Sequence, residues 1–77
     1  MSLSSYELKQ IIEVGANLII DGSDYSAYDL KQMAEVAKKS ECQLTLTNLS
    51  HLSAYDLKGI GEGGKQYVTI NLLNQKK

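Results

Sequence analysis

The sequence predicts an α/β domain in which three helix–strand units form one parallel sheet. The first observation is that the hexapeptide Ser-Ala-Tyr-Asp-Leu-Lys occurs unchanged at residues 26–31 and 53–58, with a looser copy at residues 4–9. The second is that each copy opens a helix-like apolar pattern, which gives way to a short alternating or β-branched stretch. A chain of 77 residues rarely repeats six of them by accident, so we infer three copies of one structural unit.

The first unit is expected to begin with a helix over about residues 5–14. Ser4 is a candidate N-cap, and Glu7 completes a capping box with it. In such a box the hydroxyl accepts from a free backbone N–H of the first turn, and the carboxylate reaches back to the N–H of the cap. A β-branched segment closed by Gly22 predicts a strand over about residues 17–21.

The second unit has the same order with a longer helix. Ser26 is the expected cap and Asp29 its partner in the box. The expected apolar face of this helix consists of Leu30, Met33, Ala34 and Ala37. Lys38 and Lys39 fall in the last turn, where cations suit the negative end of the helix dipole. Strict alternation over residues 43–47 predicts the second strand.

The third unit is expected to have the weakest helix. Ser53 and Asp56 repeat the capping box. Four glycines then dilute the helix, namely Gly59, Gly61, Gly63 and Gly64. Each interior glycine costs about 1 kcal/mol relative to alanine, so we expect this helix to end near residue 62. The third strand is expected over residues 67–72.

A helix–strand unit of about 25 residues is typical of α/β solenoids. Parallel strand–helix–strand connections are almost always right-handed, so strand order 1-2-3 places every helix on one face of the sheet. We therefore predict a solenoid-like single domain over residues 1–77, with units at about 3–22, 23–49 and 50–74 and a loose tail at 75–77.

The alternation in the strands predicts that the other face of the sheet is open, because a sheet covered on both sides has continuous apolar strands. The residues expected to point at the helices are Leu18, Ile20, Leu44, Leu46, Val68, Ile70 and Leu72. Those expected to line the open face are Asn17, Ile19, Asp21, Gln43, Thr45, Thr47, Tyr67, Thr69 and Asn71.

The run Leu-Thr-Leu-Thr-Asn-Leu at residues 44–49 resembles the strand and corner of a leucine-rich repeat. This resemblance covers one unit of the chain. It implies an α/β solenoid similar to leucine-rich repeats in architecture, and it implies no function specific to that family.

The composition excludes several classes of function. The net charge is −1 and no long basic cluster is present, so we expect no nucleic-acid partner. The chain has no signal peptide and no apolar run of membrane-spanning length, so we expect a cytoplasmic protein without a membrane partner. Cys42 and His51 are the only cysteine and histidine, too few for a disulfide or a structural metal site. We expect no cofactor and no metal.

The glycine cluster is the strongest candidate for a ligand site. Gly59, Gly61 and Gly64 fit G-x-G-x-x-G, and the run through Lys65 fits a phosphate loop as far as Gln66, where Ser or Thr is required. Both motifs need a strand before the glycines and a helix N-terminus after them, and here that order is reversed. Small-ligand or nucleotide-phosphate binding through Gly59–Lys65 is our alternative hypothesis. We favour a terminal helix that packs closely against its neighbours.

Two other groups of residues favour structural roles. Cys42 opens the second strand and His51 lies in the loop after it, so nothing pairs them for catalysis, and we expect no enzyme. Asp21 and Asp24 offer two carboxylates in a turn, but a calcium loop needs more oxygen ligands. A turn held by Asx-type hydrogen bonds is favoured there.

Tyr6, Tyr28 and Tyr55 occupy the same position in each unit, opposite the apolar face of the helix. Stacked units would align them as a row. One interpretation, which we favour, is that each packs on its neighbour or covers the preceding loop. The other is a contact stripe, because tyrosine is enriched at protein interfaces.

We expect the protein to form a homo-oligomer. A domain of this size is marginally stable. Stacked units normally need polar caps, which the two end units do not have, and the first and third strands would leave free sheet edges, which are rarely left unprotected. A two-fold dimer through a sheet edge or the open face is the simplest form. The interface candidates on the third strand are Tyr67, Thr69, Asn71 and Leu73. The sequence thus favours a non-enzymatic self-assembly or protein-interaction module, with a second copy or another protein as partner.

Overall fold

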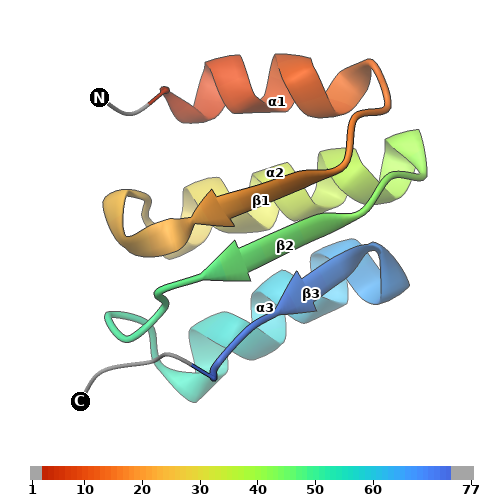
Figure 1. Cartoon of the computed structure of the whole chain (residues 1–77). Coiled ribbons are helices and arrows are strands. Elements are labelled where there is room, and N and C mark those ends of the chain that lie inside the picture. The colour runs from red at the N-terminus through yellow and green to blue at the C-terminus, as the bar shows by residue number, and fades with distance from the viewer. Residues whose placement is uncertain (1–2, 74–77) are drawn as a thin grey trace.

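The computed structural model describes residues 3–73 as alternating helices and parallel strands (Figure 1). The main elements are α1 (Ser5–Glu13), β1 (Leu18–Asp21), α2 (Ala27–Ser40), β2 (Leu44–Thr47), α3 (Ala54–Gly64) and β3 (Val68–Ile70). Two 3₁₀ turns, η1 (Gly22–Asp24) and η2 (Lys65–Tyr67), follow β1 and α3. The tail expected at 75–77 lies outside the described residues.

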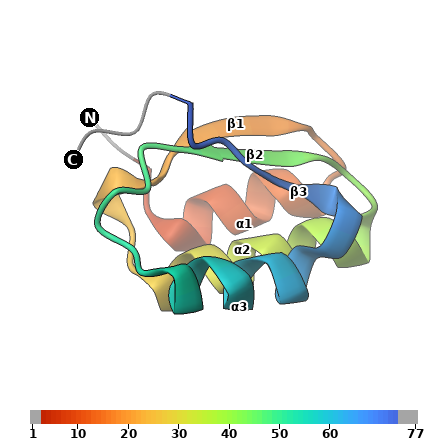
Figure 2. The ribbon, with the colours of Figure 1, turned by 90° about the horizontal axis from the view of Figure 1, so that it is seen from below.

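The three strands form one parallel sheet in the order β1-β2-β3. In the observed register Leu18 lies opposite Leu44, which lies opposite Val68. Figure 2 shows the sheet as one layer and α1, α2 and α3 as a second layer on one side of it. The mixed α/β class, the parallel strand order and the placement of the helices are therefore confirmed. No helix within residues 3–73 is long and apolar enough to cross a membrane.

Each helix begins where a serine hydroxyl accepts from a backbone N–H of the first turn. The Ser4 hydroxyl accepts from Glu7 N–H, and the Ser53 hydroxyl accepts from Asp56 N–H. At both caps the acidic side chain also accepts from the serine N–H, which completes the capping box. The Ser26 hydroxyl accepts from Asp29 N–H at 3.1 Å, the first half of the predicted box.

The third unit differs from the sequence prediction at both of its elements. Helix α3 continues to Gly64 instead of ending near residue 62, and β3 covers residues 68–70 instead of 67–72. The helix continues because two glycines allow close packing. A Cβ atom on Gly63 would lie 3.1 Å from Glu35 Cγ on α2, and one on Gly64 would lie 3.0 Å from Ala34 Cβ. These contacts between elements outweigh the poor helix propensity of glycine.

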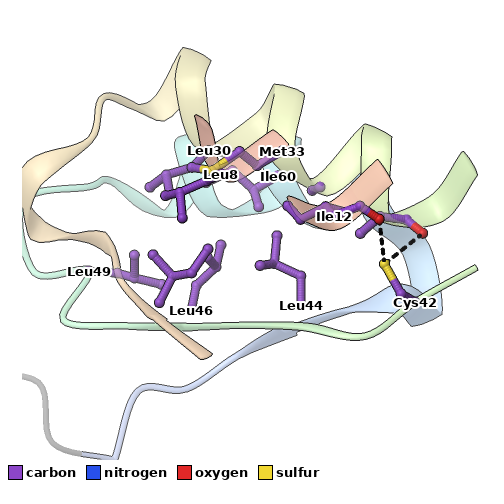
Figure 3. Packing of buried hydrophobic residues seen from close by; sticks show 12 residues of the cluster. Leu8, Ile12, Leu30, Met33, Cys42, Leu44, Leu46, Leu49 and Ile60 are labelled. Atoms are coloured by element: carbon purple, nitrogen blue, oxygen red, sulfur yellow. Dashed lines mark hydrogen bonds between the residues drawn. The ribbon is translucent and has the colours of Figure 1, made fainter. Parts of the chain in front are cut away.

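The hydrophobic core lies between the sheet and the helices. In Figure 3 Leu44 and Leu46 of β2 point at Leu30 and Met33 of α2, and Ile60 of α3 lies beside them. The buried apolar residues are Leu8, Ile12, Ile20, Leu30, Met33, Ala34, Ala37, Cys42, Leu44, Leu46, Leu49 and Ile60. No buried polar or charged residue is found in the described part of the chain. The core is thus entirely apolar, and polar chemistry is confined to the surface.

Candidate functional site

The face of the sheet opposite the helices is left uncovered by residues 3–73 (Figure 2). Ile19 of β1 stands on this face with 81% of its surface exposed, and Thr69 of β3 is also exposed. Thr45 of β2 lies between them in the register and is half-buried. Because so little of the Ile19 side chain is buried, it contributes little hydrophobic free energy to the folding of a single chain.

Polar side chains link the three strands across the start of this face. The Asn17 side-chain oxygen accepts from Gln43 N–H at 2.7 Å. The Gln43 side-chain amide donates to Thr69 Oγ1 at 3.2 Å and to the carbonyl oxygen of Gln66 at 3.1 Å. These bonds connect the start of β1 to that of β2 and the start of β2 to β3.

Asp21 lies at the opposite end of β1 and orders the turn that follows. One carboxylate oxygen accepts from Ser23 N–H at 2.9 Å and from Ser23 Oγ at 2.7 Å, and the other accepts from Asn48 Nδ2 at 3.2 Å. The bonds from Ser23, with that from Asn48, lower the pKa of Asp21 below its usual value of 3.8. The predicted Asx turn is confirmed. In the described residues no group of three or more His, Cys, Asp or Glu side chains is placed to hold a metal ion.

The predicted interface residues of the third strand lie in different surroundings. Thr69 is exposed, and Leu73 is exposed over 91% of its surface. Asn71 is half-buried, with its N–H donating to the Leu46 carbonyl oxygen and its side chain accepting from Leu73 N–H. Tyr67 differs from expectation: it belongs to η2, is half-buried and packs against the core. The 3₁₀ turn shifts it out of the alternation that β3 begins at residue 68.

Tyr6, Tyr28 and Tyr55 occupy equivalent positions of α1, α2 and α3, and we call them the tyrosine row. They are 67%, 68% and 85% exposed, so none of them is packed against a neighbour as we expected. A different tyrosine, Tyr25, packs against the core and donates from its hydroxyl to the carbonyl oxygen of Leu3, ahead of α1. Burial and the nearby carboxylates, with Asp24 foremost, raise the pKa of Tyr25 above 10.0.

Glutamines support the first two tyrosines of the row. Gln10 Nε2 donates to the Tyr6 hydroxyl at 3.4 Å, and Gln32 Nε2 donates to the Tyr28 hydroxyl at 2.9 Å. Both pairs are separated by four residues, and the same spacing from Tyr55 leads to Gly59. The spacing alone could have revealed these pairs, and sequence reasoning missed them.

Gly59, which has no side chain where α1 and α2 have a glutamine, lies in a groove between α2 and α3. The groove has a volume of about 240 Å³. It is lined by Ala27, Tyr28, Lys31, Tyr55, Asp56, Lys58, Gly59 and Glu62. A Cβ atom on Gly59 or Gly61 would meet no atom within 4 Å. The walls of the groove offer the two aromatic rings of Tyr28 and Tyr55 and charged side chains of both signs.

The predicted ligand residues of the glycine cluster lie in a helix rather than in a loop. Gly59, Gly61 and Gly64 belong to α3, and Lys65 follows at its C-cap with a positive φ of 53°. The N–H of Lys65 donates to the Gly61 carbonyl oxygen. A phosphate loop presents free N–H groups ahead of a helix, whereas these glycines are inside and at the end of one.

Cys42 and His51 lie at opposite ends of β2. Cys42 is buried, and its thiol lies 3.5 Å from the Ile12 carbonyl oxygen (Figure 3). His51 is exposed, with Nε2 2.9 Å from the Tyr25 carbonyl oxygen. The structure does not bring these two residues together.

Comparison with known protein families, with curated proteins and with solved structures finds no match. The surfaces described above are therefore the basis for any statement about function.

Proposed function

We propose that this protein is a non-enzymatic self-assembly or protein-interaction module that makes its contacts through the open sheet face and the edges of the sheet. The observation that carries this proposal is a parallel sheet covered by helices on one face only (Figure 2). Parallel sheets in folded proteins are almost always covered on both faces. The exposed Ile19, on the edge strand β1 of the bare face, is the residue that a partner would bury.

The distribution of exposed apolar side chains supports the same function. Within residues 3–73 the large exposed apolar or aromatic residues are Leu3, Tyr6, Val14, Ile19, Tyr28, Tyr55, Leu72 and Leu73. Isolated exposed apolar residues are normal on a monomer, but β1 and β3 also have free edges that can pair with another strand. A second copy of the chain is the simplest partner, because every copy carries the same edges.

The proposal includes the wider architecture. Three similar helix–strand units that stack on their neighbours form a short solenoid-like array, similar to leucine-rich repeats, in which contact surfaces extend across several units. The single thiol, buried at Cys42 and free of any disulfide, suits a reducing cytoplasmic setting.

Sedimentation of the parent protein at micromolar concentration tests this function. We expect a mass above that of one chain. Replacement of Ile19 by Thr, the residue present at the matching positions of β2 and β3, is expected to weaken any contact made through the open face. The matched control is Tyr28→Thr on the helical side of the molecule. A parent that sediments as a monomer would rule out self-assembly as the function.

A second candidate function is supported by the groove beside Gly59. Its two tyrosines and the lysines at 31 and 58 could hold a small anionic ligand with a planar group, such as a nucleotide. The test is the melting temperature with added nucleotide or inorganic phosphate. A rise that Gly59→Gln abolishes would support this site, because glutamine restores the side chain present at the same position of α1 and α2. An unchanged melting temperature would remove it.

A further inference from the structure

We infer that copies of this chain pack head to tail, with the third unit of one copy (α3 and β3) against the first unit of the next (α1 and β1). This inference rests on the proposed self-assembly and names its partner and its surfaces. The head is defined as the side of α1 and β1 that faces away from α2 and β2, and the tail as the corresponding outer side of α3 and β3. The evidence comes from residues that occupy equivalent positions when the three hexapeptides are aligned.

At the head, apolar positions are exposed that the preceding unit covers elsewhere. Met33 of α2 and Ile60 of α3 are fully buried, whereas Ile11 at the same position of α1 is only half-buried. Val36 of α2 packs against the core, whereas Val14 is 83% exposed. Ile11 in α1 and Val14 at its C-cap thus have the residue types of an internal unit and lack the neighbour that would bury them.

At the tail, the complementary positions are left open. Leu8 and Leu30 are buried, whereas Leu57 at the same position of α3 is half-buried. In α2 the next unit covers Ala34, which lies against Gly64 of α3. The matching position of the last unit is Gly61, which is partly exposed with no atom within 4 Å of an added Cβ. The tail can therefore receive a helix as α2 receives α3.

A polar contact between α1 and α2 shows the pairing that such a junction would repeat. Lys9 Nζ donates to Gln32 Oε1 at 3.1 Å across the two helices. Lys58 is the counterpart of Lys9 at the tail, and Gln10 is the counterpart of Gln32 at the head. Gln10 also repeats the bond of Gln32 to its own tyrosine, which leaves its amide oxygen as the acceptor for Lys58 of a preceding copy.

The free edges of β1 and β3 are also suited to pair with each other in a head-to-tail contact. Leu18 N–H donates to the Gln43 carbonyl oxygen, and Asn71 N–H donates to the Leu46 carbonyl oxygen. The backbone N–H and C=O groups of alternate residues point to opposite sides of a strand. The backbone groups of Ile19 therefore point to the free edge of β1, and those of Ile70 point to the free edge of β3. Continuing the register of β1, β2 and β3 would place β3 of one copy parallel to β1 of the next. A contact between two different surfaces produces a ring or an open chain rather than a closed two-fold dimer.

Two variants that each block one end test this inference. Val14→Glu places a carboxylate on the head, where its counterpart Gly63 lies against Glu35 of the neighbouring helix. Gly61→Glu places a carboxylate on the tail. Both positions tolerate the change in a single chain, because Val14 is exposed and a Cβ on Gly61 meets open space. Gly61→Ala is the matched control, since it copies Ala34 and leaves the tail apolar.

The mass in solution is measured by sedimentation at micromolar concentration. We expect the parent to exceed two chains as its concentration rises, each blocked variant to be a monomer, and an equimolar mixture of the two to have the mass of two chains. The mixture associates because one variant keeps an intact tail and the other an intact head. Should Val14→Glu lose the helical signal of the parent, Gln10→Lys replaces it, because it sets a second ammonium against Lys58.

The outcomes that contradict the inference are distinct from failure of the proposed function. A monomeric parent would end both this inference and the proposed self-assembly. A parent that associates while both blocked variants associate equally well would place the contact on another surface, such as the open sheet face. A single variant that blocks association, with no recovery in the mixture, would indicate a two-fold dimer through one end. Either of these last results would overturn the head-to-tail arrangement and leave self-assembly standing.

Discussion

Gly64 of α3 lies so close to Val68 of β3 that a Cβ atom on residue 64 would be 2.7 Å from the Val68 Cβ. Only the absence of a side chain allows the end of the last helix to contact the start of the last strand. The same position is Ala37 in α2, where the helix ends differently with Glu41 in the left-handed region. Gly64 therefore fixes the turn through which the third unit closes.

Replacement of Gly64 by Ala is expected to destabilise the protein by about 1–3 kcal/mol, since the added methyl group forces backbone or side-chain movement. Gly59→Ala and Gly61→Ala are the controls, because each stands in a helix with no atom within 4 Å of the new carbon. These two are expected to raise the free energy of unfolding by up to about 1 kcal/mol each. Urea denaturation measures all three. Equal stability of Gly64→Ala and Gly61→Ala would contradict the close approach.

Removal of the cap hydroxyls is expected to cost about 1 kcal/mol each in Ser26→Ala and Ser53→Ala. The acidic partners should differ, because Asp56 accepts from Ser53 N–H at 3.2 Å and so completes a box, whereas the box at Ser26 has only its hydroxyl half. Asp56→Ala is thus expected to destabilise more than Asp29→Ala. Thermal melts of the four variants check this. A larger loss from Asp29→Ala would mean that the boxes are not as described.

The stability of the protein is expected to fall in acid partly through Asp21. Its pKa is lower in the folded chain than the usual value of 3.8, so its contribution is fully present above that pH and is lost as the pH falls through the folded value. Asp21→Asn keeps an oxygen for the Ser23 N–H but carries no charge. We expect its melting temperature to lie below that of the parent at neutral pH and the two to converge below pH 3.8. A difference in melting temperature that stays constant well below pH 3.8 would show that the charge of Asp21 does not contribute.

The thiol of Cys42 is expected to react with an aromatic disulfide reagent only when the chain opens. It is 4% exposed and lies between the carbonyl oxygens of Ile12 and Ala37. Because a buried thiol cannot reach the reagent, labelling in buffer should be much slower than labelling in urea. The rate is followed by absorbance. Equal rates in both solvents would place the thiol at the surface.

Most of the fold could be predicted from the sequence because its determinants are local or topological. Each helix start depends on a serine and an acidic residue within one turn, as at Ser4 and Ser53. The parallel order and the single helical layer follow from the handedness of strand–helix–strand connections. The alternation of β2, with Leu44 and Leu46 buried, identified the face that meets the helices.

The features that the sequence did not predict depend on contacts between distant residues. The end of α3 was misplaced because propensity counts Gly63 and Gly64 against a helix, whereas their packing against α2 and β3 favours it. Tyr67 was assigned to the open face by alternation, but it belongs to η2, and the strand pattern begins only after it. Among the candidate surfaces, the tyrosine row follows from the repeat, while the bond between Lys9 and Gln32 requires knowing how α1 lies against α2.

The concentration of fully buried residues in the middle of the molecule bears on how it opens. Leu30, Met33, Leu44 and Leu46 have no exposed surface, and all of them belong to α2 and β2. Amide protons of this central pair should therefore exchange with deuterium last, because either outer unit can detach while exposing less apolar area than loss of the centre would. The chain would lose its order from the outside inward, and the strand with a neighbour on each side would be the last to be released.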